Sequence, residues 1–183
     1  MSAVREKIRS IVKGIQPFDD KEALDISETL AWIDSGVEIF RVKKPDTPNK
    51  HLVSYFCVYD VEQKKLLLVD HIKAQLWLPA GGHVDVGENP KTTARRECRE
   101  ELDVEANFMF GEPIFITANK TVGLTAPHTD VSLWYVLSAS QDEITNFDRR
   151  EFNSIKWFSL DEVPLKSSDP QMGRFIAKFK SLL

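Results

Sequence analysis

Apolar residues in the N-terminal part of the chain recur at the spacing of amphipathic helices. A first set predicts one helix that ends before Gln16-Pro17: Val4, Ile8, Ile11, Val12 and Ile15. Asp19 or Asp20 is a suitable N-cap for a second helix, which would have an apolar stripe of Leu24, Leu30 and Ile33 and a stop at Ser35-Gly36. The chain therefore opens with two helices, within residues 1–36.

The pattern then changes to short runs rich in Val, Leu, Phe and Tyr. Residues 51–59 and 65–70, separated by a polar segment, predict a β-hairpin. A short strand and a glycine-bearing loop should follow, and then a helix over 90–102. Further strands are predicted over 108–117, 130–138 and 154–158, and a C-terminal amphipathic helix is marked by Met172, Phe175, Ile176, Phe179 and Leu183. This interleaved order predicts a mixed β-sheet flanked by helices, an α/β (α+β) fold.

Composition narrows the class of protein. The 183 residues, 42% of them apolar, suit a single domain over 1–183. A net charge of −4 argues against binding a nucleic-acid polymer, although a small anion remains possible where a bound cation reverses the local field. No apolar run is long enough for a membrane span or a signal peptide, so we expect a cytoplasmic protein. Cys57 and Cys98 are expected to be free thiols.

Three glutamates in the predicted helix over 90–102 are the main candidates for chemistry. On a helix, Glu97, Glu100 and Glu101 fall within a sector of roughly 100°. Such crowding is unfavourable unless a cation compensates it, and Mg²⁺ or Mn²⁺ suits oxygen ligands. Arg96 can pair with Glu100 or with Glu88, which would fix a carboxylate. A solvated acidic surface is the alternative interpretation of the three glutamates.

The spacing of these residues resembles the signature of the Nudix hydrolase family. The matching positions are Gly82, Glu88, Arg96, Glu97, Glu100 and Glu101, with Cys98 and Val104 in apolar slots. Asp103 stands where the family has glycine, and Asp tolerates a left-handed backbone better than most residues. Segments 77–82 and 157–162 also resemble the family, so the resemblance covers residues 50–183 and implies an α/β/α sandwich. The helices of 1–36 would be an extension.

The resemblance implies metal-dependent hydrolysis of a diphosphate bond in a nucleoside diphosphate linked to another group. It implies Glu97, Glu100 and Glu101 as metal ligands, with the Gly81 or Gly82 carbonyl as a further candidate, and Glu88 as a residue that orients the loop or acts through water. Glu97 or Glu101 would be the general base, although family members also use an acidic residue from a distant loop. Here those candidates are Asp142, Glu143 and Glu151.

Several polar residues outside the signature are candidates for substrate binding. They are His83, His128, Asp130 and Glu143, and a structural hydrogen-bonding role is the alternative for each histidine. Candidates for stacking on a base are Trp77, Trp134, Tyr135, Phe56 and Phe115. No subgroup mark identifies the substrate. Two other functions remain open: a non-catalytic ligand-sensing or interaction module, and an isomerase, for which the chain lacks the residue set. The N-terminal helices are candidates for a homodimer contact.

Overall fold

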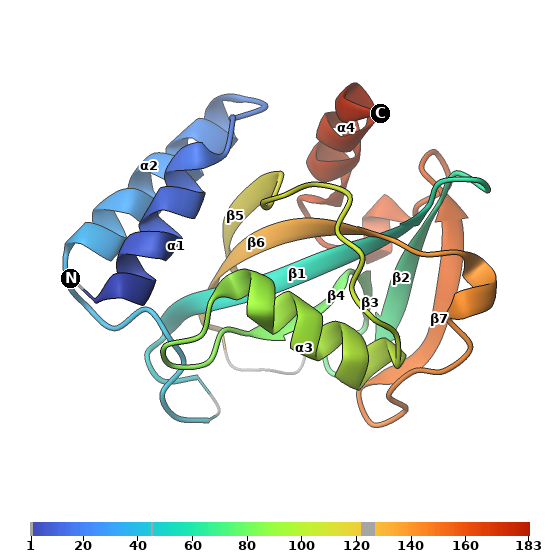
Figure 1. Cartoon of the computed structure of the whole chain (residues 1–183), viewed down its shortest axis with the longest axis horizontal. Helices are drawn as coiled ribbons and strands as arrows, with labels where there is room; N and C mark the ends of the chain where they lie inside the picture. Colours follow the sequence, from blue (N-terminus) through green and yellow to red (C-terminus); the bar gives the residue numbers. More distant parts are fainter. Residues whose placement is uncertain (1, 45, 122–126) are drawn as a thin grey trace.

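The computed structural model describes residues 2–44, 46–121 and 127–183, and its centre is one seven-stranded mixed sheet (Figure 1). The main strand order is β3-β2-β1-β6-β5, with β4 paired to β1 and β7 paired to β2. The strands are β1 Lys50–Asp60, β2 Lys65–His71, β3 Leu76–Leu78, β4 Ala80–His83, β5 Phe115–Lys120, β6 Thr129–Ser138 and β7 Phe152–Ser159. Among the strands of the described residues, only the pair of β1 and β6 is parallel.

Strand β1 divides one of its edges between two partners. Residues 53–56 pair with β4, whereas residues 58–60 pair with β2 at the predicted hairpin. Its other edge pairs with β6 over its full length, from Lys50 opposite Thr129 to Tyr59 opposite Ser138. The early halves of β1 and β6 therefore lie beside the glycine-bearing strand β4, and this is where the candidate site forms.

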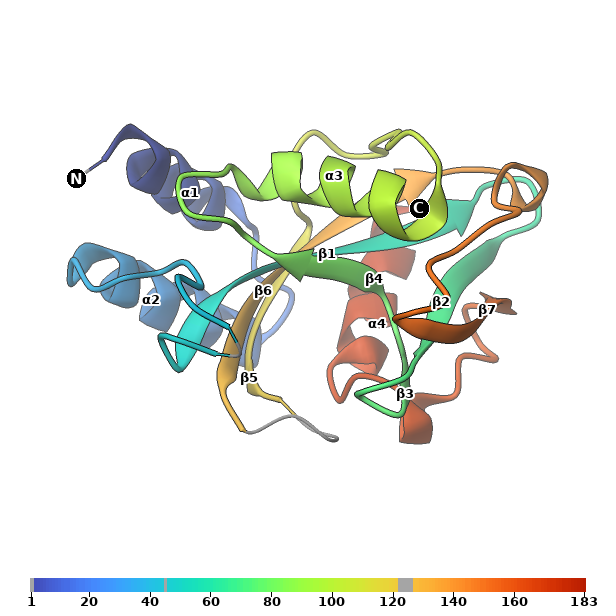
Figure 2. The same ribbon diagram turned by 90° about the horizontal axis from the view of Figure 1, so that it is seen from below.

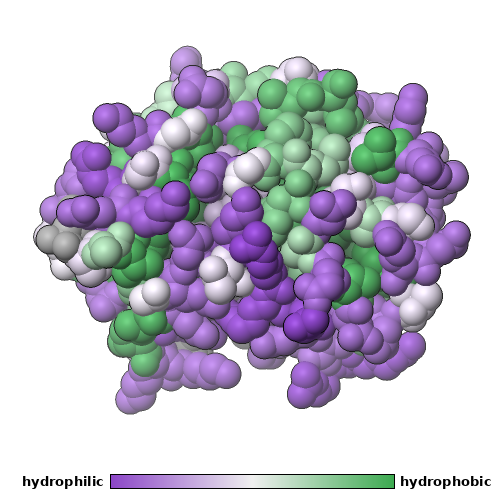
Figure 3. Space-filling model, viewed as in Figure 1, coloured by the Kyte–Doolittle hydropathy of each residue, from purple (hydrophilic) through white to green (hydrophobic). Residues whose placement is uncertain are grey.

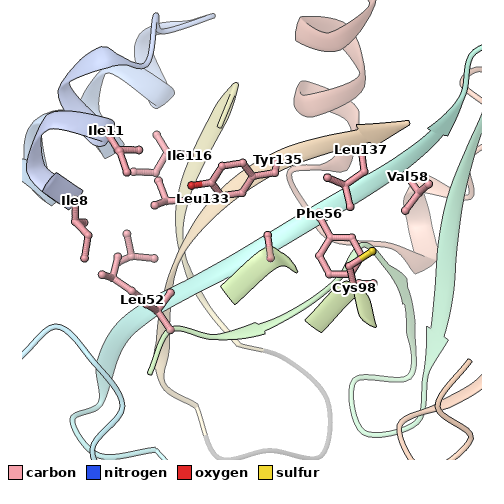
Figure 4. Packing of buried hydrophobic residues seen from close by; sticks show 14 of the residues in the cluster. Ile8, Ile11, Leu52, Phe56, Val58, Cys98, Ile116, Leu133, Tyr135 and Leu137 are labelled. Atoms are coloured by element: carbon pink, nitrogen blue, oxygen red, sulfur yellow. The ribbon is translucent and has the colours of Figure 1, made fainter. Parts of the chain in front are cut away.

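Side chains alternate between the two faces of the sheet and build a separate apolar cluster on each. One cluster joins Phe56 and Leu133 to Cys98 of helix α3 (Pro90–Leu102) and to α1 (Ala3–Gly14). Figure 4 shows Ile8 and Ile11 directed towards this sheet face, and Cys98 beside Phe56. The other cluster packs Trp134 against Phe175 of α4 (Met172–Leu182). Figure 2 shows α3 and α4 on opposite faces, which confirms the predicted layered fold.

The N-terminal helices occur as predicted, but the second buries its predicted face only in part. Asp19 caps α2 (Asp20–Asp34) by accepting a hydrogen bond from the Glu22 amide at 2.9 Å. Leu24 was predicted in the apolar stripe, yet its exposed fraction is 51%. Ile33 is buried as predicted and Leu30 packs partly buried against the core, but the other buried residues of the helix are Glu22, Asp25 and Thr29. The orientation is set by the Glu22 carboxylate, which accepts hydrogen bonds from Lys178 at 2.8 and 2.9 Å.

Two predicted segments differ from the observed elements. The strand expected over 108–117 begins only at Phe115 and continues to Lys120, since Gly111 and Pro113 interrupt the earlier part, where Phe108 makes one isolated bridge to Leu137. The expected glycine-bearing loop begins as strand β4, because Gly81 and Gly82 pair with Tyr55 and Ser54. Short 3₁₀ helices occur at Gln141–Glu143 and Leu165–Ser167.

Hydrophilic side chains cover most of the surface seen in Figure 3, with an apolar area in its upper half. Both cysteines are free and buried, as predicted. Within the described ranges, the longest helix, α2, has 15 residues, and none of the helices has the length and apolar character of a membrane span.

Candidate active site

A cavity of about 810 Å³ opens where β1, β4 and β6 meet, beyond the part of the sheet that α4 covers. Its walls include α3, the glycines of β4, residues of β1 and β6, and the loop that precedes β7, together with residues of the loop before β1, the turn between β2 and β3, the end of β5 and the loop before α4. The size is typical of a small-molecule site. Except for Glu88, the charged residues of the family signature therefore line one cavity together with the candidates His83 and His128.

The three glutamates of α3 all lie on this cavity, as their helical spacing predicted. The Glu101 side chain accepts a hydrogen bond from the Gly81 amide at 2.8 Å, which ties the helix to β4. Gly82 leaves the space that Glu97 occupies: a Cβ atom added there would lie 2.2 Å from the Glu97 Oε1 atom. The glycines thus allow two carboxylates to approach the backbone of a neighbouring strand.

Arg96 holds the carboxylates around it in place. Its guanidinium donates to both Glu88 oxygens, at 3.3 and 3.0 Å, and to Glu97 Oε1 at 2.6 Å. Glu100 lies 3.6 Å away and stays exposed. Glu88 also accepts from the Thr93 hydroxyl at 2.7 Å and does not line the cavity, so it fixes the loop before α3. Arg96 therefore pairs with both of its predicted partners, Glu88 and Glu100.

Burial and hydrogen bonding together shift the pKa values of the three carboxyl groups Glu88, Glu97 and Glu101 in different directions. Desolvation raises the pKa of Glu97, and the Arg96 charge only partly offsets it. The pKa of Glu101 lies well above its usual value because of desolvation and the neighbouring Glu97 charge. At Glu88 burial acts to raise the pKa, but hydrogen bonds from Arg96 and Thr93 outweigh it and lower the pKa. Glu97 and Glu101 are therefore short of positive charge.

A cluster of three histidines lies partly on the cavity: His83 and His128 line it, and His51 packs against both. His51 of β1 and His128 stack with their ring centroids 4.9 Å apart, and His83 of β4 lies 4.8 Å from His51. Asp130 lies 3.2 Å from His51 Nε2 and 3.1 Å from His128 Nε2. Desolvation, assisted by the Arg41 charge, lowers the pKa of His83 to about 3, so its imidazole is neutral at physiological pH. The predicted candidates His83, His128 and Asp130 thus belong to one group.

Other candidates from the sequence are placed elsewhere. Asp142 and Glu143 do not line the cavity, and Glu143 accepts a hydrogen bond from the Ser140 amide at 2.6 Å. Of the three loop carboxylates, only Glu151 lies on the cavity. Four of the five proposed stacking aromatics are fully buried: Phe56, Phe115, Trp134 and Tyr135. Trp77 does not line the cavity either.

Several cavity residues were not predicted as site residues. Tyr55 lines the cavity and packs edge-on against Trp134, and Asp169 lies nearby with a pKa raised by burial. His51, also not predicted, is fully buried at the start of β1 and does not itself line the cavity, but it packs against His83 and His128. The residue pattern of the strand could have indicated Tyr55, because residues 55, 57 and 59 share one face. Nothing in the sequence pattern indicated that Asp169, a late loop residue, would join it.

A comparison with family models decides the relationship of this chain to known proteins. The model of the NUDIX domain matches residues 50–179. The chain belongs to the NUDIX domain family. The family match begins after both N-terminal helices. It includes Gly81, Gly82, Glu97, Glu100 and Glu101, which together we call the carboxylate wall of the cavity.

Curated relatives match part of this chain. The rat bis(5'-nucleosyl)-tetraphosphatase [asymmetrical] is 33% identical over 92 residues, which are 48% of this chain and 58% of the rat protein. This chain thus spans just over half the length of the curated relatives it matches.

Two solved structures share the fold. A NUDIX-family hydrolase from Clostridium perfringens has a TM-score of 0.57 at 21% identity, covering 73% of this chain and 98% of that one. The NUDIX domain of Shewanella oneidensis NrtR, complexed with ADP ribose, has a TM-score of 0.56 at 20% identity, covering 71% and 86%.

Proposed function

We propose that this chain hydrolyses a diphosphate bond in a nucleoside diphosphate linked to another group, with Mg²⁺ or Mn²⁺ as cofactor. The observation that carries the proposal is the meeting of Glu97, Glu100 and Glu101 on one wall of a nucleotide-sized cavity. Membership of the NUDIX domain family supports the same chemistry.

The donor set of this wall fits a hard divalent cation. It consists of carboxylate oxygens, which Mg²⁺ and Mn²⁺ prefer, and the desolvation of Glu97 and Glu101 leaves their negative charge undercompensated. Glu97, Glu100 and Glu101 would hold the ion, and the carbonyls of Gly81 and Gly82 are further candidates. When bound, the ion supplies charge stabilisation at the phosphoryl group and activates water.

Residues around the glutamates have positioning roles in this proposal. Arg96 keeps Glu97 directed at the cavity and is itself held by Glu88. The Gly81 amide holds Glu101. Glu151, at the exposed end of the cavity, is our candidate among the loop carboxylates for accepting the proton of the attacking water, beside Glu97 and Glu101.

Dinucleoside tetraphosphates are the first substrate class to test. The rat relative is named for such a substrate, although only part of its length is matched. ADP-ribose is the second, because the similar NrtR domain was solved with it. The cavity also carries Arg41, Lys44, Lys73 and Lys120, whose positive charges suit a chain of phosphates.

The test is a product-release assay on dinucleoside tetraphosphates, ADP-ribose, nucleotide sugars and nucleoside triphosphates, with Mg²⁺ or Mn²⁺. We expect Glu100→Gln and Glu101→Gln to lower kcat on the order of 10²-fold or more. The matched control is Glu105→Gln, just after the same helix, because Glu105 is exposed and pairs with Arg99 away from the cavity.

If hydrolysis is unaffected by both Glu100→Gln and Glu101→Gln, the carboxylate wall is not the metal site. If no diphosphate is hydrolysed and one of these compounds binds tightly, the chain is instead a ligand-binding module of the same fold.

A further inference from the structure

The histidine cluster of the cavity has the composition of a transition-metal site, separate from the glutamates. Three of the chain's four histidines lie in it, with Asp46 from the loop before β1. One potential ligand atom from each of Asp46, His51, His83 and His128 lies within 4.8 Å of all the others. Sheet pairing explains the meeting, because β1 and β6 start side by side and β4 ends beside them.

The hydrogen bonds of His51 leave one buried ring nitrogen without a partner. Its Nδ1 atom lies 2.8 Å from the Pro48 carbonyl oxygen, which can only accept, so Nδ1 carries the hydrogen. Nε2 is therefore the ring nitrogen that can offer a lone pair to a cation. It faces Asp130 Oδ1, another acceptor, at 3.2 Å, and neither of these buried atoms makes a hydrogen bond. A cation between these groups would satisfy both.

From this geometry we propose that Asp46, His51, His83 and His128 bind one transition-metal ion of the Zn²⁺ class, with Asp130 beside it. Three imidazoles and one carboxylate suit Zn²⁺ or Co²⁺, whereas Mg²⁺ prefers an all-oxygen set. Ligand atoms of a tetrahedral zinc site lie about 3.4 Å apart, so the group must contract slightly. Asp46 lies in a loop, and rotation of its side chain is the smallest such movement. The proposal does not depend on hydrolysis at the carboxylate wall.

Arg41 competes with the metal ion for one ligand. Its Nη1 atom lies 3.2 Å from His83 Nε2, and because a guanidinium can only donate, His83 accepts that hydrogen bond. Metal binding through Nε2 would displace Arg41. Removing the Arg41 charge should consequently strengthen metal binding.

The test uses the untagged full-length chain, stripped with a chelator and titrated with Co²⁺ and Zn²⁺ in excess Mg²⁺, followed by visible absorption of Co²⁺ and by calorimetry. We expect one Co²⁺ per chain. His51→Gln and Asp46→Asn should weaken binding on the order of tenfold or more, and Arg41→Met should strengthen it. His71→Gln, a cavity histidine outside the cluster, and Glu100→Gln should leave it unchanged.

Three results would overturn the proposal: no stoichiometric Co²⁺ binding, equal affinity in the wild type and Asp46→Asn, or a loss in Glu100→Gln as large as in His51→Gln. Asp46→Asn decides the outcome if His51→Gln does not fold, as judged by circular dichroism, because Asp46 lies outside the buried core.

Discussion

Position 82 requires glycine because the Glu97 side chain of the neighbouring helix α3 occupies the space that a Cβ atom would need. An added Cβ would overlap Glu97 Oε1, the movable end of a side chain, whereas at Gly81 it would lie 2.2 Å from the Ser54 carbonyl oxygen. We therefore expect Gly82→Ala to displace the Glu97 carboxylate and lower kcat on the order of 10²-fold, with a stability change of at most about 1 kcal/mol. Gly81→Ala should instead destabilise the fold.

Steady-state kinetics and urea unfolding measure the two effects. Gly111→Ala is the control, because nothing lies within 4 Å of an added Cβ there. Full activity in Gly82→Ala would show that Glu97 does not need its observed position.

A site residue can be predicted from the sequence when its neighbours along the chain determine its position. Helical spacing alone brings Glu97, Glu100 and Glu101 together, and a single helix produces that arrangement. His51 and Asp130 come together only through pairing of β1 with β6, and single-chain patterns do not specify strand partners. Four of the five stacking candidates lie in the core, and the sequence could not say which, because alternation does not tell which face of the sheet a helix covers.

At the scale of elements, the end of α3 carries a measurable backbone strain. Asp103 caps this helix in the left-handed region, with φ 56° and ψ 33°, and its amide donates to the Arg99 carbonyl at 3.1 Å. This is the conformation expected at the position where the family has glycine. We expect Asp103→Gly to raise the free energy of unfolding by about 0.5–1 kcal/mol, and Asp103→Ala to lower it by about 1 kcal/mol.

Thermal unfolding of the two variants checks the prediction, since a change of 1 kcal/mol shifts Tm by about 2–4 °C in a chain of this size. Both substitutions moving Tm in the same direction would contradict the explanation by backbone strain.

Helices and strands were predicted correctly where the local sequence preference and the packing in the fold favour the same structure. Helix α3 has the predicted bounds, because Asn89 caps it, Pro90 starts it and Cys98 and Leu102 form its buried stripe. Helix α2 was predicted with part of its buried face, Leu30 and Ile33, but Leu24 was wrong because an apolar pattern does not show that Glu22 is buried in an ion pair. Strand β5 starts later than predicted, because the apolar residues of 108–117 suggest a longer strand than Gly111 and Pro113 allow.

At the scale of the whole molecule, a buried ion pair connects the N-terminal helices to the C-terminal helix. Glu22 and Lys178 are 0% and 6% exposed, and Glu22 also accepts from the Phe18 amide at 2.7 Å. Removing one partner leaves the other charge buried, so Glu22→Gln and Lys178→Met should each cost about 3 kcal/mol. The double variant should cost less than the sum, as measured by urea unfolding. Additive costs would show that the two residues act independently.

A second link between the same helices responds to pH. Asp19 bonds to Arg174, with 2.7 Å from Nε to Oδ2, and this hydrogen bond lowers the pKa of Asp19 to about 2. Because the folded-state pKa lies below that of the unfolded chain, the contribution is present above about pH 4 and is lost as pH falls towards 2. Partial solvent exposure limits it to about 1 kcal/mol.

Asp19→Asn keeps an N-cap side chain but cannot titrate. Its Tm should therefore fall less than that of the wild type between pH 4 and pH 2. Parallel curves across that interval would contradict a role for this ion pair in acid stability.

The parallel pairing of β1 with β6 also has a consequence for the order of folding. Each residue of β1 meets a partner about 80 residues later in the chain, so this pair must close a long loop and should form slowly. During synthesis the hairpin of β1 and β2 and helix α3 would exist before β6 emerges. The carboxylate wall can thus assemble early, whereas the histidine cluster must wait for the second half of the chain.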